Sequence, residues 1–219
     1  MVDAYVELGV NMAYDAGVAA WTFDLSLWGM CGQGLDEAAA LDDLTSRIAS
    51  VTPEAAGLVE VVVVETIGGD EQAFARDRVP CSDRERQRTT EILTDTRAQT
   101  IELVQKCSAR ELDNDDPDRT LPGFAHWRTL RQMAWHLADT ESRYYLPAVG
   151  LPWRMPASDL LQELVESGDH VRRQLAKVPG HLVVEGGEVW TTVKLMRRLA
   201  WHERSELETM QVMLSRLRR

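Results

Sequence analysis

The sequence has few cysteines and no long hydrophobic run. Cys31, Cys81 and Cys107 are widely spaced, so they form neither a disulfide framework nor a CxxC metal motif. The apolar stretches, such as residues 61–64, fall far short of the roughly 18 residues that a membrane-spanning helix needs. The first residues also lack the basic region and apolar segment of a signal peptide. We therefore expect reduced thiols, no membrane partner and a cytoplasmic location.

Basic residues are almost absent from the first third of the chain. Residues 1–71 hold thirteen acidic residues and one base, Arg47, whereas the remaining residues hold 22 acidic and 23 basic ones. Nucleic-acid binding depends on Lys and Arg that neutralise phosphates, so we expect no nucleic-acid partner. The change in charge predicts two units, residues 1–71 and 82–219, joined by a linker over 72–81.

The first unit is predicted to be a small mixed α/β module. Residues 4–10 and 18–25 alternate between apolar and polar side chains and predict a β-hairpin, which a short strand or turn around residues 29–34 follows. Residues 35–48 have helical spacing that ends at Pro53, and the Val-rich residues 58–66 predict a further strand.

The segment Leu-Trp-Gly-Met-Cys-Gly-Gln-Gly-Leu-Asp-Glu-Ala leads into the predicted helix of this unit. The segment and the order of strands and helix resemble the HicB-like antitoxin fold over about residues 1–70. No basic DNA-binding extension follows, and the resemblance implies no particular toxin partner. Because fold is a poor guide to function, a dimerisation or lid domain is the more general interpretation, and a homodimer would be consistent with it.

The second unit is predicted to contain four helices. Ser82 and Glu85 have the spacing of a capping box that opens a helix running to about residue 109. Three further helices are predicted over residues 127–146, from a cap at Ser158 to 178, and over 189–217. We therefore expect an α+β protein in which the small mixed α/β module precedes an up-and-down four-helix bundle.

The last predicted helix has polar residues in the middle of an apolar face. Glu203 interrupts the apolar stripe, and His202 and Glu206 lie beside it. Burying ionisable groups is costly unless they are paired or bind a metal. Residues four apart on a helix have Cβ atoms about 5–6 Å apart, which suits two ligands of one ion. His136, on the predicted helix over 127–146, is the candidate third ligand.

Two segments carry a further resemblance. Residues 127–141, Trp-Arg-Thr-Leu-Arg-Gln-Met-Ala-Trp-His-Leu-Ala-Asp-Thr-Glu, are similar to the second helix of the DinB-like bundle family. Residues 199–204, Leu-Ala-Trp-His-Glu-Arg, are similar to its fourth helix, and the resemblance spans about residues 82–218. Members characteristically bind a divalent metal, often zinc or nickel, through one His on the second helix and two His four residues apart on the fourth.

His136 and His202 match the first two ligand positions of that family, and Glu206 stands at the third. Two His and one carboxylate still bind Zn²⁺ or Fe²⁺, so the metal could be zinc, nickel or iron. Family members include S-transferases that use mycothiol or bacillithiol. The resemblance therefore implies an enzyme in which the metal activates an external low-molecular-weight thiol toward an electrophilic small molecule. Asp139 or Glu203 would orient a ligand or act as a base.

Other interpretations remain open at this point. The bundle could be a non-enzymatic metal-binding or partner-binding protein with a degenerate site, or a hydrolase that uses metal-bound water. His136 could simply bond to Thr140, and His202 could pair with Glu206 across one helical turn. The histidines expected at the surface are His126, His170 and His181. The tryptophans expected in the core rather than in a cofactor site are Trp127, Trp135, Trp190 and Trp201.

Overall fold

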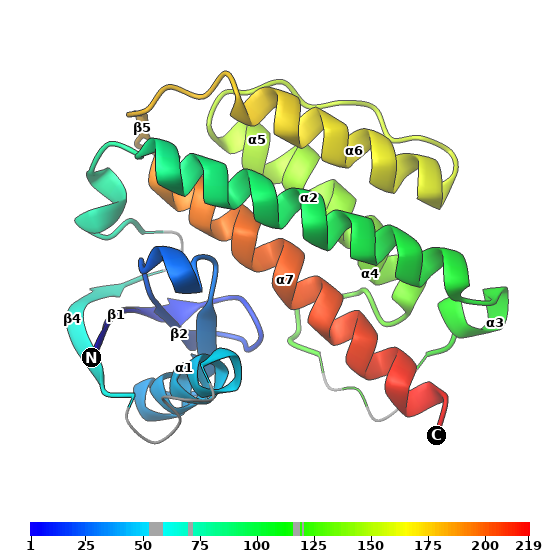
Figure 1. Cartoon of the computed structure of the whole chain (residues 1–219), viewed down its shortest axis with the longest axis horizontal. Coiled ribbons are helices and arrows are strands. Elements are labelled where there is room, and N and C mark those ends of the chain that lie inside the picture. The colour runs from blue at the N-terminus through cyan, green and yellow to red at the C-terminus, as the bar shows by residue number, and fades with distance from the viewer. Residues whose placement is uncertain (53–58, 70–71, 116–118, 120) are drawn as a thin grey trace.

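A computed structural model describes the chain except for residues 53–58, 70–71, 116–118 and 120. It contains a four-stranded sheet near the N-terminus followed by a set of packed helices (Figure 1). The expected mixture of a sheet-containing part and a helical part is therefore confirmed. Among the described residues, no helix is both long enough and apolar enough to cross a bilayer. Pro53, residue 58 and residue 71, which bound predicted elements, lie outside the described residues.

The sheet has the strand order β3-β2-β1-β4, with β1 antiparallel to β2 and parallel to β4. The predicted hairpin is confirmed, with Tyr5 opposite Trp21. Its second strand ends at Trp21 rather than at residue 25, because Asp24 caps a 3-10 turn at Leu25–Leu27. The elements of this unit are β1 (Val2–Val10), β2 (Gly17–Trp21), β3 (Cys31–Gly34), α1 (Glu37–Val51) and β4 (Val61–Gly68).

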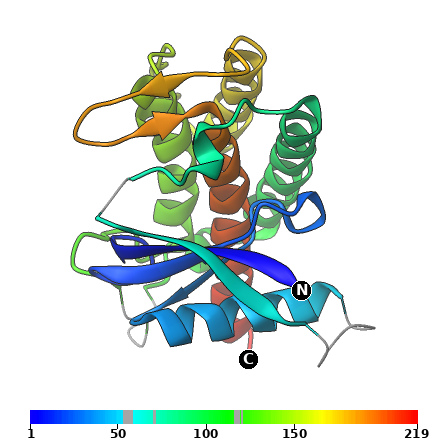
Figure 2. The same ribbon diagram turned by 90° about the vertical axis from the view of Figure 1, so that its left-hand side faces the viewer.

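The sheet has a helix on each face. One face of β1 and β2, including Val6 and Ala20, packs against Leu44 of α1. This packing is so close that a Cβ atom on Gly32 would lie 2.2 Å from the Ala40 carbonyl oxygen. On the opposite face Trp21 contacts Trp201 of α7, with ring centroids 5.7 Å apart. Figure 2 shows α1 and the long helices on opposite sides of the sheet.

The helices α2, α4, α6 and α7 pack against one another, and in Figure 1 α6 lies beyond α2 as seen from the sheet-containing unit. Short helices, a two-stranded hairpin and a π-helical turn connect them. The elements are α2 (Asp83–Lys106), α3 (Ala109–Leu112), α4 (Leu130–Asp139), the π-helical turn η4 (Thr140–Tyr145), α5 (Leu146–Ala148), α6 (Leu160–Leu175), β5 (Val183–Val184), β6 (Trp190–Thr191) and α7 (Thr192–Leu217).

The capping box of Ser82 and Glu85 at the start of α2 is confirmed. Other helix ends differ from the predictions. The helix expected from residue 127 begins at Leu130, because the Thr129 side chain caps it by accepting from the Gln132 amide. The cap of α6 is Asp159 rather than Ser158. The start of the last helix moves from residue 189 to Thr192, because residues 190–191 pair as strand β6.

Buried charges join α7 to the sheet unit and to the segment between β4 and α2. Arg197 donates to both carboxylate oxygens of Asp77, at 2.8 and 2.7 Å. Arg198 donates to Glu7 at 3.2 Å, and the Trp21 indole donates to the same carboxylate at 2.7 Å. All of these side chains are buried. Acidic side chains of the N-terminal half thus meet basic side chains of α7 at a shared interface.

Candidate metal centre

The structure brings the three predicted metal ligands together. The Nε2 atoms of His136, on α4, and His202, on α7, lie 3.3 Å apart. Glu206, one helical turn after His202, places its Oε1 atom 3.8 Å from Nε2 of His202 and 4.0 Å from Nε2 of His136. These atoms are the ones that each side chain would offer to an ion, and they lie within 4.8 Å of one another.

Apolar packing between α4 and α7 sets the separation of these ligands. Met133 and Leu137 of α4 share a core cluster with Met210 and Leu214 of α7. His136 lies one residue before Leu137, at the edge of this packed face. Because His202 and Glu206 are four residues apart on a regular helix, both side chains point toward His136.

The other ring nitrogens of the two histidines have their own partners. Nδ1 of His202 lies 3.4 Å from Oε1 of Glu141, in the π-helical turn η4. Nδ1 of His136 lies 3.1 Å from the Thr140 hydroxyl. A carboxylate at Nδ1 favours the tautomer in which Nε2 carries the free lone pair, the arrangement that metal-binding histidines characteristically have. The predicted contact between His136 and Thr140 is therefore confirmed, and it coexists with the cluster.

Aromatic rings fix the plane of each imidazole. The Trp127 indole stacks on His136 with ring centroids 3.5 Å apart and an interplanar angle of 9°. Tyr145 meets His202 edge to face at a centroid distance of 5.6 Å. These contacts limit ring rotation and so help to hold the two Nε2 atoms in place.

Burial controls the protonation of the cluster. It lowers the pKa of His136 to about 3, with repulsion from His202 as the next cause. It also lowers the pKa of His202 to about 3, helped by the positive charges of Arg97 and Arg198. Both imidazoles are therefore neutral near pH 7, as metal ligands must be.

Glu206 is the member of the cluster that lacks hydrogen-bond partners in the described part of the chain. Burial raises the pKa of its carboxyl to about 7. Its Oε2 atom is buried and has no hydrogen-bond partner among the described residues. An unpartnered buried carboxylate oxygen is costly, and a cation beside it would remove that cost.

The donor set fits a divalent ion. Zinc bonds to His nitrogen are about 2.0–2.1 Å long, so tetrahedral ligand atoms lie roughly 3.4 Å apart. The three ligand-atom separations in the cluster are 3.3, 3.8 and 4.0 Å. Small side-chain movements would close the two longer distances. Two imidazoles and one carboxylate are also a donor set that zinc, nickel and ferrous iron accept.

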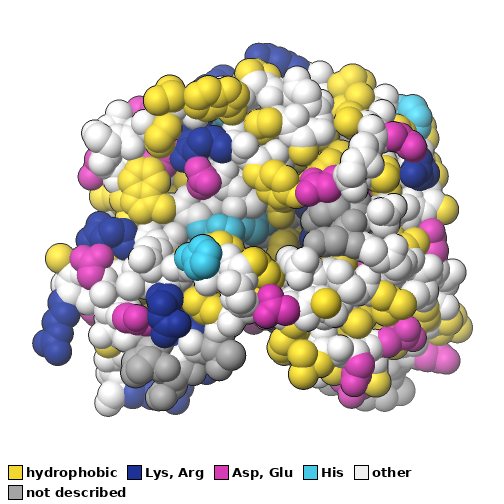
Figure 3. Space-filling model, turned by 180° about the vertical axis from the view of Figure 1, so that it is seen from behind, with side chains coloured by type: hydrophobic (Ala, Val, Ile, Leu, Met, Phe, Trp, Pro, Cys, Tyr) yellow, Lys and Arg dark blue, Asp and Glu magenta, His cyan; other side chains and the backbone are white. Residues whose placement is uncertain are grey.

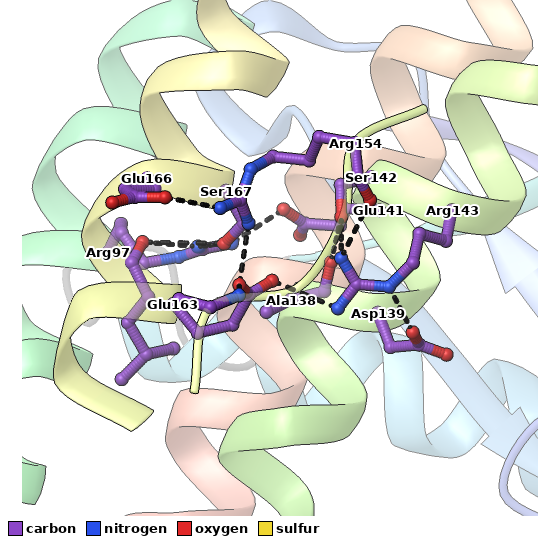
Figure 4. Close-up of polar contacts among 12 residues, drawn as sticks. Arg97, Ala138, Asp139, Glu141, Ser142, Arg143, Arg154, Glu163, Glu166 and Ser167 are labelled. Atoms are coloured by element: carbon purple, nitrogen blue, oxygen red, sulfur yellow. Dashed lines mark hydrogen bonds and ion pairs between the residues drawn. The ribbon is translucent and has the colours of Figure 1, made fainter. Parts of the chain in front are cut away.

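Glu203 is buried as expected from the interrupted stripe, but it faces a different group. Its Oε1 atom accepts from Nε of Arg97, on α2, at 2.9 Å. Nη2 of the same guanidinium donates to Oε2 of Glu141 at 2.7 Å, and Nη1 donates to Ser167 at 2.9 Å (Figure 4). Burial raises the pKa of both carboxyls, and Arg97 opposes that shift. Arg97 thus links Glu203 to Glu141, which contacts His202.

Asp139, the other residue expected to assist, is not brought into the cluster. Its side chain is largely exposed and forms an ion pair with Arg143, which also donates to Glu163 at 2.9 Å (Figure 4). The Nδ1 partner of His136 is Thr140 rather than Asp139.

A cavity of about 250 Å³ opens beside the three ligands. Its walls are largely aromatic and include Phe124, Trp127, Tyr144 and Trp201. Asn11 and Met12, from the β1–β2 turn, also line it, so the sheet unit forms part of the site. In Figure 3 cyan histidine side chains lie near the middle of the face, some at the surface and some set back behind them.

Sequence reasoning missed Glu141, Arg97 and the β1–β2 turn. A basic residue within the apolar stripe of the helix over 82–109 was the available signal for Arg97. The expectation of a surface position was wrong for His170, which is buried with Nε2 2.7 Å from the Pro152 carbonyl oxygen. His126 and His181 are exposed, as expected.

The chain was also compared with known proteins. No family model matches it, and neither the curated proteins nor the solved structures gave a significant match.

Proposed function

We propose that His136, His202 and Glu206 hold one divalent metal ion and that the protein is a metal-dependent enzyme acting on a small molecule. The observation that carries this proposal is the convergence of two Nε2 atoms and Oε1 of Glu206 at the wall of a cavity. Zinc is the favoured ion because two imidazoles and one carboxylate form a known zinc site, and nickel and iron are the alternatives.

The resemblance to DinB-like proteins gives the proposal its reaction class. In this interpretation the helices α2, α4, α6 and α7 form an up-and-down bundle, and the reaction is the transfer of an external low-molecular-weight thiol, of the mycothiol or bacillithiol type, to an electrophile. A divalent ion, when bound, supplies the Lewis acidity that keeps a thiol deprotonated at neutral pH.

The residues of the chain would bind and orient the reactants. Glu141 and Thr140 would hold the two imidazoles through Nδ1, and the aromatic walls of the cavity would contact the apolar parts of the reactants. In the transfer itself the thiol would give its proton to solvent, and the sulfur would form a bond to the electrophilic carbon. A leaving group would depart with the bonding electron pair. In an epoxide the C–O bond would open and the oxygen would take up a proton, and in an activated alkene a proton would add to the neighbouring carbon.

The sulfur nucleophile would come from outside the protein. Cys31 and Cys81 are buried, and burial raises the pKa of the Cys81 thiol to about 11. None of the three cysteines lines the cavity beside the ligands. The proposal therefore requires an added thiol rather than a protein thiolate.

A non-enzymatic role is the second candidate, and one observation favours it. The separation of 3.3 Å between the two Nε2 atoms also suits an N–H···N hydrogen bond, which needs no metal. Such a protein would be a metal-binding or partner-binding descendant with a degenerate site.

A thiol-consumption assay separates the two functions. Purified protein loaded with zinc is mixed with a bacterial thiol and an epoxide, halide or activated alkene, and loss of free thiol is followed with and without a chelator. An enzyme should consume the thiol only with metal bound, and the separate variants Cys31→Ala, Cys81→Ala and Cys107→Ala should retain activity. Loss of activity in one of these variants with metal retained would show that the protein supplies its own nucleophile. No consumption across a panel of thiols and electrophiles would favour the binding protein.

A further inference from the structure

A second cavity, of about 410 Å³, lies between the sheet unit and the helices α2 and α7. Met30, Cys31 and the end of α1 form one side, and Arg88 of α2 with Arg204 of α7 forms the other. Trp201 lines both this cavity and the one beside the metal ligands, but none of the three ligands lines the second cavity. It is therefore a separate space that the proposed reaction does not use.

Three arginines and one acid line this cavity, and their charges are unequally neutralised. Arg47 is fully engaged, because it donates to Asp43 at 2.9 Å and to Glu208, the lining acid, at 2.8 Å. Arg88 reaches Glu91 at 3.3 Å, but both side chains are well exposed, so that pair contributes little. Asp95 lines a neighbouring hollow that Arg88 and Arg204 share.

Arg204 is the unusual member. Its Nη1 donates to the Trp28 carbonyl oxygen at 2.5 Å, and the described part of the chain offers it no ion pair. Burial lowers the pKa of its guanidinium, and the nearby charge of Arg88 lowers it further. Arg88 and Arg204 thus line a cavity whose one lining carboxylate, Glu208, pairs with Arg47. A bound anion would offset the repulsion between Arg88 and Arg204.

The rest of the lining is suited to an apolar group. Met30, Val51 and the Trp201 ring offer apolar surface on the same cavity. Guanidinium groups bind carboxylates and phosphates with paired hydrogen bonds, which a neutral ligand cannot reproduce. We propose that this cavity binds a small organic anion whose carboxylate or phosphate contacts Arg88 and Arg204 and whose apolar part lies against Met30 and Trp201.

Calorimetric titration of the full chain with four probes tests the proposal. Phenyl phosphate and benzoate carry the two kinds of anionic group, benzyl alcohol carries only the ring, and inorganic phosphate carries only the charge. We expect at least one of the aromatic anions to bind and to bind more tightly than inorganic phosphate, and we expect no binding of benzyl alcohol. The stronger of the two aromatic anions identifies the preferred group. No heat of binding for either aromatic anion at millimolar concentration would overturn the proposal.

Three variants locate the site. Arg88→Gln and Arg204→Gln should each raise the Kd of the better probe roughly tenfold or more, because each removes a charged hydrogen-bond donor. Arg84→Gln, at an exposed position of the same helix as Arg88, should leave the Kd unchanged. If loss of the contact to Trp28 prevents Arg204→Gln from folding, Arg204→Lys replaces it and keeps the charge. Arg88→Gln tests the proposal whether or not Arg204→Gln folds. A wild-type Kd in Arg88→Gln would overturn the proposal.

Discussion

At the scale of single residues, the carboxylate of Glu206 distinguishes this cluster from a three-histidine site. It shares a helix face with His202, and its Oε2 atom is buried with no hydrogen-bond partner in the described chain. An anionic ligand makes a bound ion a weaker Lewis acid than a third imidazole would. In the proposed metal centre, the choice of residue at this one position would therefore affect both metal affinity and metal reactivity.

Replacing this carboxylate tests its role as a ligand. Glu206→His should lower the Kd for zinc by roughly tenfold, because imidazole suits zinc and the four-residue spacing is unchanged. Glu208→His, at an exposed position two residues later, serves as the control and should bind zinc as the wild type does. Competition with a chromogenic zinc chelator measures both values. Equal or weaker binding by Glu206→His would mean that Glu206 is not a ligand.

The contact between Glu141 and His202 predicts a separate effect. Glu141→Gln should weaken metal binding about tenfold or more, because the carboxylate that orients His202 is lost. Glu203→Gln is a matched control, since Glu203 also accepts from Arg97 but the structure gives it no contact with either histidine. Both variants should lose about 1–3 kcal/mol of stability in urea unfolding, and only Glu141→Gln should lose metal affinity. Equal losses of affinity would contradict the assigned role of Glu141.

At the scale of elements, the π-helical turn η4 shapes the site. Glu141 belongs to the π-helical turn at Thr140–Tyr145, and its carboxylate lies against His202. Such π-helical turns often occur at functional sites.

This element marks the limit of what the sequence could predict. His136, His202 and Glu206 could be found from the sequence. A four-residue spacing and an interrupted apolar stripe have the same structural meaning in any regular helix. Glu141 lies four residues after the buried Leu137, so its burial had a similar signal, but its contact with His202 depends on how this segment packs on α7. The contribution of Asn11 and Met12 to the cavity depends on how the sheet unit packs on α7, a contact between segments far apart in the chain. The division of the chain at 72–81 stays a prediction.

The helix α7 has a second buried polar face, directed at the sheet unit. Arg197→Met should destabilise the protein by about 3–5 kcal/mol, because Asp77 would lose the buried partner that holds both of its oxygens. Arg173→Met, at an exposed position on α6, should change stability by less than about 0.5 kcal/mol. Urea unfolding followed by circular dichroism measures both. A small effect for Arg197→Met would show that this ion pair is not important for stability.

At the scale of the whole molecule, the acidic sheet unit and the basic face of α7 form one interface. The unbalanced charge of residues 1–71 is partly matched there, since Glu7 faces Arg198. The same docking brings the β1–β2 turn to the metal-centre cavity and encloses the second cavity. Both proposed ligand sites therefore depend on the contact between the two parts of the chain.

The charge distribution also predicts behaviour toward nucleic acid. The chain carries a net charge of −11, and basic residues are scarce in its first third, so few phosphates could be neutralised. We expect no binding at physiological salt in a gel-shift assay with random and genomic DNA fragments. A sub-micromolar, sequence-selective complex would contradict this expectation and would support the antitoxin resemblance.

The central claim, a metal centre at His136, His202 and Glu206, is tested most directly by the metal content of the purified protein. Elemental analysis of protein prepared without chelator should find about one divalent ion per chain. The double variant His136→Ala, His202→Ala should lose it, while His126→Ala, at an exposed position, should keep it. A wild-type protein that takes up no divalent ion, or a double variant that keeps full occupancy, would contradict the account.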